Sequence, residues 1–129
     1  MLLAIDTSSL VLSCALAEKD KLVAEWTVQK RLTHSEQLIP HMDEILKDAG
    51  VDQKEITAIA AAKGPGSFTG LRIGLATAKT AAYIWKVPLI GVDTLEALVW
   101  NLVGARAFIL PLLDAQRGNV YAAMYGSFD

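Results

Sequence analysis

The sequence has little of several features that would define a class of protein by themselves. Only one of the 129 residues is a cysteine, Cys14, which excludes a disulfide framework and a cysteine metal cluster. Basic residues are not in excess, since 12 lysines and arginines stand against 14 aspartates and glutamates; a free-standing nucleic-acid binder is therefore not expected. No apolar run reaches the roughly 18 uncharged residues of a membrane span, and Asp6 interrupts the N-terminal run, so we expect neither a membrane anchor nor a signal peptide. The expected compartment is a reducing cytoplasm.

Apolar residues, in contrast, are abundant and make up 53% of the chain. A chain of this length can form one domain with a substantial core. Such an apolar fraction indicates either that both faces of a sheet are covered or that some apolar surface contacts a partner. Cys14 lies in an apolar run, which favours a small buried hydrophobe over a reactive thiol.

The pattern predicts an α/β chain: three antiparallel strands followed by alternating helices and strands. A capping box, Thr33 to Glu36, opens the first helix, which contains Pro40 and ends at Gly50. Asp93 or Thr94 caps the third helix. The expected strands cover residues 2–6, 10–17, 22–28, 56–62, 88–92, 108–113 and 120–125. The two later helices are expected over 75–85 and 94–103.

A glycine-rich segment, Lys63–Gly74, lies between an expected strand and an expected helix. A strand, a glycine-rich turn and a helix in that order commonly direct backbone N–H groups at an anion. Gly64 and Gly66 permit positive φ and close approach, and Ser67 or Thr69 can cap the helix. The spacing fits neither the phosphate loop of NTPases nor the dinucleotide fingerprint. A tight connection without a ligand stands as the alternative.

Two acidic turns are candidates for a nucleotide site. Asp6 ends the first strand and could hold a metal-bound water, while the hydroxyls of Thr7, Ser8 and Ser9 could donate to a phosphate. Asp114 ends a later strand and could form the opposing wall. The alternative is that each acid caps its own turn, which aspartate does readily.

Two further features allow more than one interpretation. His34 and His41 are seven residues apart along one helix, and solvated or partner-facing histidines are favoured over a metal pair because no third ligand is evident. Small residues leave part of the second helix almost bare, which indicates close approach either to the sheet of the same domain or to a second chain. These residues are Gly74, Ala78, Ala81 and Ala82.

Five segments together resemble the TsaB (YeaZ) family, bacterial proteins of tRNA threonylcarbamoyladenosine (t6A) biosynthesis. The segments are Leu3–Ser8, His34–Ser35, Lys63–Arg72, Gly91–Leu95 and Asp114–Gly118. The resemblance implies a ribonuclease-H-like lobe of the actin-like superfamily, in which the lobe occurs twice with a nucleotide between the copies. We accordingly expect residues 1–105 to form the first lobe and 106–129 to be the opening hairpin of a truncated second lobe.

The resemblance also implies that this chain is not itself catalytic. The related catalytic protein TsaD carries two metal-binding histidines four residues apart, where this sequence has Thr94 and Leu98. Neither residue type provides a transition-metal site in that arrangement, so no metal is expected. No cofactor is required, although ATP or ADP with Mg²⁺ could bind at Asp6 and the glycine-rich segment. The alternative is an actin-like ATPase or kinase, or the metallopeptidase activity once assigned to the wider family.

The role that the resemblance implies is a scaffold subunit that dimerises with TsaD and stabilises it, with the ATPase TsaE as a third partner. The assembly transfers a threonylcarbamoyl group to N6 of adenosine 37 in tRNA; this chain would contact tRNA only through the complex and form a homodimer when alone. The helices of the first lobe should form the interface. Its candidate residues are His34, Leu38, Arg72, Gly74, Ala78, Ala81, Ala82 and Trp85.

Overall fold

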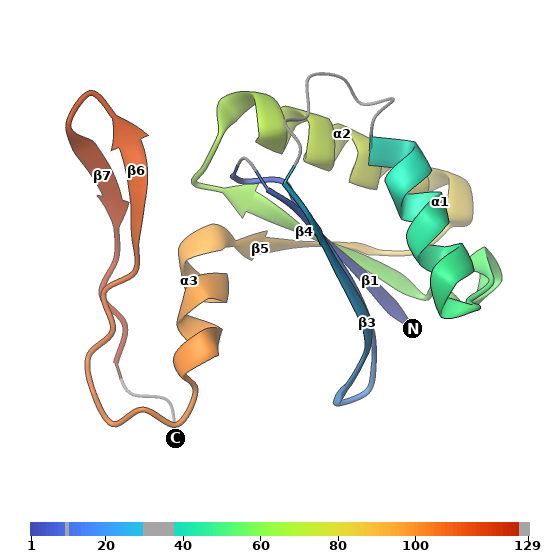
Figure 1. The fold of residues 1–129 in the computed structure, drawn as a ribbon, viewed down its shortest axis with the longest axis horizontal. Coiled ribbons are helices and arrows are strands. Elements are labelled where there is room, and N and C mark those ends of the chain that lie inside the picture. Colours follow the sequence, from blue (N-terminus) through green and yellow to red (C-terminus); the bar gives the residue numbers. More distant parts are fainter. Residues whose placement is uncertain (10, 30–37, 127–129) are drawn as a thin grey trace.

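A five-stranded mixed sheet forms the centre of the protein in this computed structural model, which describes residues 1–9, 11–29 and 38–126 (Figure 1). Its strands are β1 (Leu2–Asp6), β2 (Leu12–Glu18), β3 (Lys21–Val28), β4 (Ala58–Gly64) and β5 (Leu89–Asp93). They lie in the order β3-β2-β1-β4-β5, with β1, β2 and β3 antiparallel and β4 and β5 parallel to β1. Three antiparallel strands followed by two crossover strands form the ribonuclease-H-like lobe, so the predicted fold class is confirmed.

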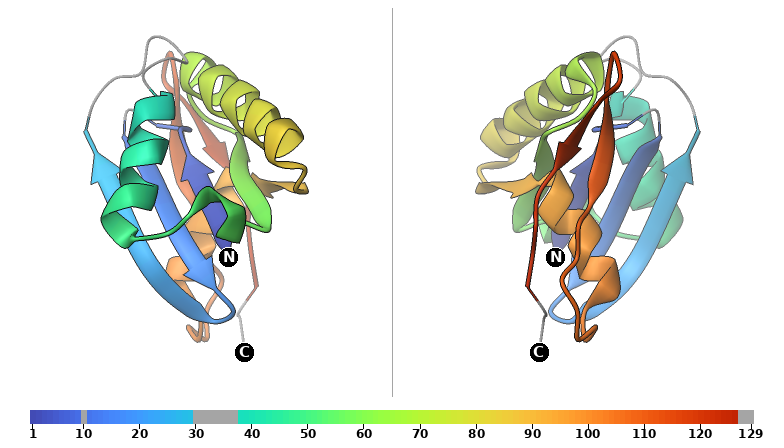
Figure 2. Two further views of the ribbon diagram at one scale, coloured as in Figure 1. Left: turned by 90° about the vertical axis from the view of Figure 1, so that its right-hand side faces the viewer. Right: turned by 90° about the vertical axis from the view of Figure 1, so that its left-hand side faces the viewer.

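Helices cover the two faces of this sheet unequally. The helices are α1 (Leu38–Ala49), α2 (Phe68–Trp85) and α3 (Thr94–Val99), with short 3₁₀ turns η2 (Gln53–Glu55) and η3 (Trp100–Leu102). α1 and α2 pack side by side on one face, and α3 lies on the other (Figures 1 and 2). None of the described helices is both long and apolar enough to cross a membrane.

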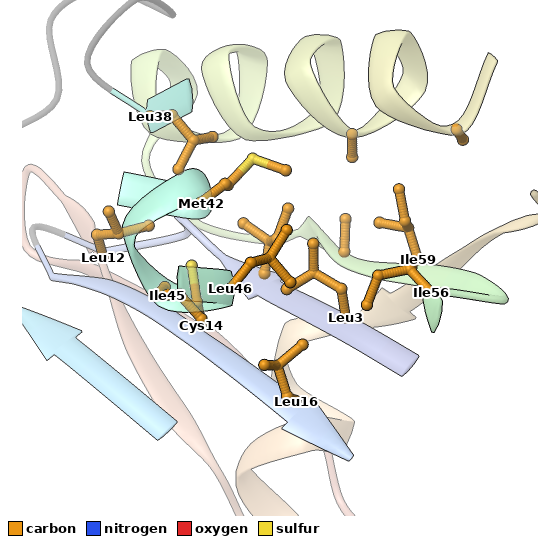
Figure 3. Packing of buried hydrophobic residues seen from close by; sticks show 14 of the residues in the cluster. Leu3, Leu12, Cys14, Leu16, Leu38, Met42, Ile45, Leu46, Ile56 and Ile59 are labelled. Carbon is orange, nitrogen blue, oxygen red and sulfur yellow. The ribbon is translucent and has the colours of Figure 1, made fainter. Parts of the chain in front are cut away.

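The main core lies between the sheet and the helices α1 and α2. Strand β1 alternates in burial, so that Leu3 and Ile5 point into this core, 0% and 3% exposed. Met42 and Leu46 of α1 meet them from above, as Figure 3 shows for the labelled side chains. The remaining buried residues of this cluster are Leu12, Cys14, Leu16, Leu38, Ile45, Ile56, Ile59, Ala61, Ile73, Ala78 and Ala82. Burial of Cys14, 2% exposed, confirms its predicted place in the core.

The boundaries of two helices differ from the prediction. α2 begins at Phe68 rather than at residue 75, because Ser67 caps it and the two glycines that the sequence placed in a loop, Gly70 and Gly74, are helical. α3 ends at Val99 rather than at residue 103, and the chain continues as the 3₁₀ turn η3. Asp93 caps α3 by accepting from the N–H of Glu96 at 3.0 Å, one of the two predicted alternatives. The predicted capping box of the first helix, Thr33 to Glu36, lies outside the described residues.

The last part of the described chain is a separate two-stranded hairpin, β6 (Leu112–Gln116) and β7 (Asn119–Ala122). It stands apart from the five-stranded sheet at the left of Figure 1. The predicted boundaries of these strands, 108–113 and 120–125, were wrong. Pro111 cannot donate a hydrogen bond to a sheet partner, and before it only an isolated bridge forms, between Ile109 and Tyr125. That this hairpin opens a second lobe stays a prediction.

Candidate functional site

The glycine-rich segment sits directly on the turn that follows β1. At Gly66, an added Cβ would collide with the backbone oxygen of Ser8, and at Gly70 with the backbone oxygen of Thr7. At Gly74 it would collide with the hydroxyl of Thr7. Glycine is therefore needed at three successive points because the start of α2 touches the β1 turn without any side chain between them.

Hydrogen bonds join the same two segments. The buried hydroxyl of Thr7 donates to the carbonyl of Gly70 at 2.7 Å, and the backbone N–H of Ser67 donates to the carbonyl of Ser8 at 2.7 Å. The N–H of Gly70 donates to the hydroxyl oxygen of Ser67 at 3.2 Å, which makes Ser67 the N-cap, one of the two predicted alternatives. The Thr7 hydroxyl and the N–H groups of Ser67 and Gly70 thus donate to acceptors within the chain rather than pointing at an open anion site. This geometry matches the alternative of a tight connection without a ligand.

Both candidate acids support their own turns. Asp6 accepts from the backbone N–H of Ser8 at 2.9 Å and from its hydroxyl at 2.5 Å. In the hairpin, Asp114 accepts from the backbone N–H of Gln116 at 2.8 Å. Among the described residues, no hydrogen bond or ion pair joins Asp114 to the β1 turn. The arrangement is the turn-capping alternative at each acid, and nucleotide binding at Asp6, Thr7, Ser8, Gly64, Gly66, Ser67 or Asp114 stays a prediction.

A hollow of about 180 Å³ lies on the face of the sheet that carries α3. Asp6, Ser13 and Glu25 line its polar side. Its remaining lining is mostly small and apolar: Ala4, Ile5, Cys14, Ala15, Ala60, Ala61, Ala62, Val92 and Ala97. Asp6 borders this hollow, whereas no residue of the glycine-rich turn lines it. Through Ser8, however, Asp6 also lies next to that turn, since Ser8 donates to Asp6 and accepts from the N–H of Ser67.

One histidine and the cysteine can be placed in the structure. His41 lies beside Glu44, with 3.9 Å between Nδ1 and Oε2, and His34 falls outside the described residues. In residues 1–9, 11–29 and 38–126, no group of three or more His, Cys, Asp or Glu side chains could hold a metal ion. Burial raises the pKa of the Cys14 thiol to about 12, so the thiolate needed for nucleophilic chemistry does not form near neutral pH.

The segment that contains Thr94 and Leu98, the positions expected to align with metal-binding histidines of TsaD, forms the helix α3. Thr94 begins α3 and is buried, 3% exposed, whereas Leu98 lies on the exposed side of the same short helix. Asp93, between β5 and α3, caps that helix. The two positions thus carry one buried hydroxyl and one exposed aliphatic side chain, neither of which suits a transition metal.

The bare face of α2 is occupied by the domain itself. Ala78 is fully buried, and Gly74 and Ala82 are buried as well. Gly74 lies against Thr7, and the two alanines lie in the main core. Leu38 of α1 is also fully buried. Packing within the domain already covers these four residues, and a role for them in a partner interface stays a prediction. Ala81 and Trp85 are half-buried against the same core, and Arg72 is exposed.

The exposed face of the two helices carries apolar residues that the sequence did not single out. On α2, Phe68, Tyr83 and Ile84 are 73%, 86% and 65% exposed, and Ile39 of α1 is 57% exposed. The guanidinium of Arg72 lies over the Phe68 ring, 5.3 Å from its centre, one helical turn away. We call these five residues the helix surface. The predicted second helix began at residue 75 and so did not include Phe68 or Arg72.

Comparisons with known proteins give a consistent result. The family model "TsaD: tRNA N6-adenosine threonylcarbamoyltransferase" matches residues 28–129. The chain is 39% identical over 124 residues to the tRNA threonylcarbamoyladenosine biosynthesis protein TsaB of Bacillus subtilis, which covers 96% of this chain and 54% of that protein. It is 37% identical over 127 residues to TsaB of Escherichia coli, again 96% of this chain and 54% of that protein. The chain thus spans about half the length of these relatives.

Solved structures agree with the fold. YeaZ from Pseudomonas aeruginosa superposes with a TM-score of 0.83 at 30% identity, over 97% of this chain and 59% of that one. RuvC of Thermus thermophilus gives a TM-score of 0.51 at 12% identity, over 76% of this chain and 66% of that one. At that identity, the second match shows the ribonuclease-H-like fold alone.

Proposed function

The chain belongs to the TsaD-related family, where it corresponds to the N-terminal part of the TsaB (YeaZ) members, and from this premise we propose that it is a non-catalytic subunit in t6A modification of tRNA. The modification places a threonylcarbamoyl group on N6 of adenosine 37. The expectation that the catalytic relative carries metal-binding histidines at the positions of Thr94 and Leu98 supports a non-catalytic role, because neither residue type here is a transition-metal ligand.

The helix surface is the observation that carries the partner role. Its aromatic and aliphatic side chains are largely exposed, on two helices whose other faces contribute buried residues to the core. Interfaces are enriched in such aromatic and arginine anchors. We therefore propose that this surface pairs with TsaD, and with a second copy of the chain when TsaD is absent. TsaE would bind the resulting pair, and tRNA would be contacted only through the complex, in the cytoplasm.

Light scattering coupled to size-exclusion chromatography tests the pairing. The chain should elute as a homodimer alone and as a mixed complex after addition of TsaD. A chain that stays monomeric in both samples would contradict the proposal.

A double substitution on the helix surface should separate pairing from folding. Tyr83→Ser with Ile84→Ser removes two exposed anchors and should weaken association with TsaD by about tenfold or more. Because both side chains are largely exposed, the thermal midpoint should stay close to that of the unsubstituted chain. The matched control is Leu22→Ser with Val23→Ser on the edge strand β3, also exposed, which should leave association unchanged. Equal affinity of the two double variants would place the interface elsewhere.

We also propose that the chain needs no nucleotide. Titration with ATP and Mg²⁺ in a calorimeter should give no saturable heat, since the hydroxyls and amides at the β1 turn donate within the chain. Asp6→Ala should instead reduce the free energy of unfolding, by about 1 kcal/mol, because two hydrogen bonds of the turn are lost. Saturable, Mg²⁺-dependent heat that disappears in Asp6→Ala would favour the nucleotide-binding alternative.

A further inference from the structure

A second hollow lies between α1 and the β2–β3 end of the sheet, away from the glycine-rich turn. It has a volume of about 160 Å³. The edge strand β3 contributes Trp26 and Val28, both half-buried, and β2 contributes Leu12. Ile45 of α1 closes the apolar lining, and Figure 3 shows it beside Leu12 and Cys14 at this end of the core. The hollow exists because α1 does not fully cover the last strand of the sheet.

Carboxylates border this apolar lining. Glu44 and Asp48 lie one helical turn apart on α1, and both are exposed. The nearest basic residue along the helix, Lys47, forms an ion pair with Asp43 instead, with 2.9 Å between Nζ and Oδ2. His41 completes the border, 3.9 Å from Glu44. The rim is therefore negatively charged while its floor is apolar and aromatic.

The size and the donor set restrict what can occupy the hollow. Pockets for small-molecule ligands typically measure about 300–1,000 Å³, so this one suits a single side chain rather than a metabolite. A metal ion is not indicated, because the described residues contain no group of three or more ligands with suitable geometry. A side chain with an apolar stem and a cationic end matches both parts of the lining.

We propose that this hollow receives an arginine side chain of a protein partner. The aliphatic stem would lie on Val28 and Leu12, the planar guanidinium would stack on the indole of Trp26, and Glu44 and Asp48 would accept from its N–H groups. Arginine fits better than lysine because its flat, forked head group can use an aromatic face and two carboxylates together. The hollow lies on the β3 side of α1 and shares no residue with the helix surface. Failure of the pairing with TsaD would therefore not contradict this proposal.

The test is an NMR titration of the full chain with acetyl-Gly-Arg-Gly-amide at pH 8 and at constant ionic strength. The indole signal of Trp26 and the amides of α1 around Glu44 should shift with a dissociation constant on the order of 1–10 mM, as expected for one exposed, charge-assisted anchor. The neutral analogue with citrulline should bind at least about fivefold more weakly, and the lysine peptide about threefold more weakly.

A matched pair of variants completes the test. Glu44→Gln with Asp48→Asn should weaken binding of the arginine peptide by roughly fivefold. Glu18→Gln with Asp20→Asn changes the net charge equally in the β2–β3 hairpin and should leave binding unchanged. Equal binding of arginine and citrulline, equal binding of arginine and lysine, or no saturable shift would each overturn the proposal. Shifts of the Trp26 indole signal on dilution without peptide that persist in Tyr83→Ser with Ile84→Ser, where pairing through the helix surface is lost, would show that a second copy of the chain fills the hollow, and would overturn it as well.

Discussion

Gly70→Ala is expected to lower the free energy of unfolding by about 3 kcal/mol. An alanine Cβ at this position would overlap the backbone carbonyl of Thr7, and a backbone atom of a central strand end cannot move aside cheaply. The same shift would disturb the hydrogen bond from the Thr7 hydroxyl to the carbonyl of Gly70. Urea unfolding followed by circular dichroism measures the change.

The sign of this effect is what makes it informative. Gly70 is helical, and helix propensity alone predicts that alanine would stabilise the protein by about 1 kcal/mol. The steric cost at Thr7 should exceed this gain. Gly126→Ala is the control, because a Cβ there meets nothing within 4 Å, and it should change stability by less than about 0.5 kcal/mol. A Gly70→Ala variant as stable as the unsubstituted chain would show that α2 does not rest on the β1 turn.

Ala78→Leu should destabilise the protein by about 3 kcal/mol, at the upper end of the usual cost of overpacking a core. Ala78 is fully buried between α2 and the sheet, in a cluster that includes Ile59 and Ile73. The added isobutyl group can fit only if the helix moves away from β4. Any loss of association with TsaD in this variant would follow from loss of the fold and would say nothing about an interface.

Ala76→Leu provides the comparison on the same helix. Ala76 lies on the exposed side of α2, so the larger side chain enters solvent and stability should change by no more than about 0.5 kcal/mol. Urea midpoints of the two variants should therefore differ clearly. If both variants were equally stable, the in-domain packing of the small residues of α2 would be refuted, and their assignment to a partner interface would regain support.

Local patterns in the sequence predicted much of the fold. A short apolar run identified β1, and alternation of apolar residues identified β3. Polar residues before the helices gave the caps Ser67 and Asp93, each as one of two alternatives. The predicted start of α2 was wrong because a local rule met a tertiary contact. Gly70 and Gly74 appeared to belong to a loop because glycine disfavours helices, but close packing against Thr7 accounts for them inside α2.

The candidate site divides in the same way. By itself, the sequence determined which residue types are available: acids at two turns, glycines before a helix, and no histidine at positions 94 and 98. Only the tertiary structure decided how they are used. In the folded chain the hydroxyls of Thr7 and Ser8 donate to acceptors within the chain, and Ala78 is buried in the core between α2 and the sheet. Periodicity fixes which residues share a face of a helix, but whether that face meets a sheet, a partner or solvent depends on contacts between residues distant in the sequence.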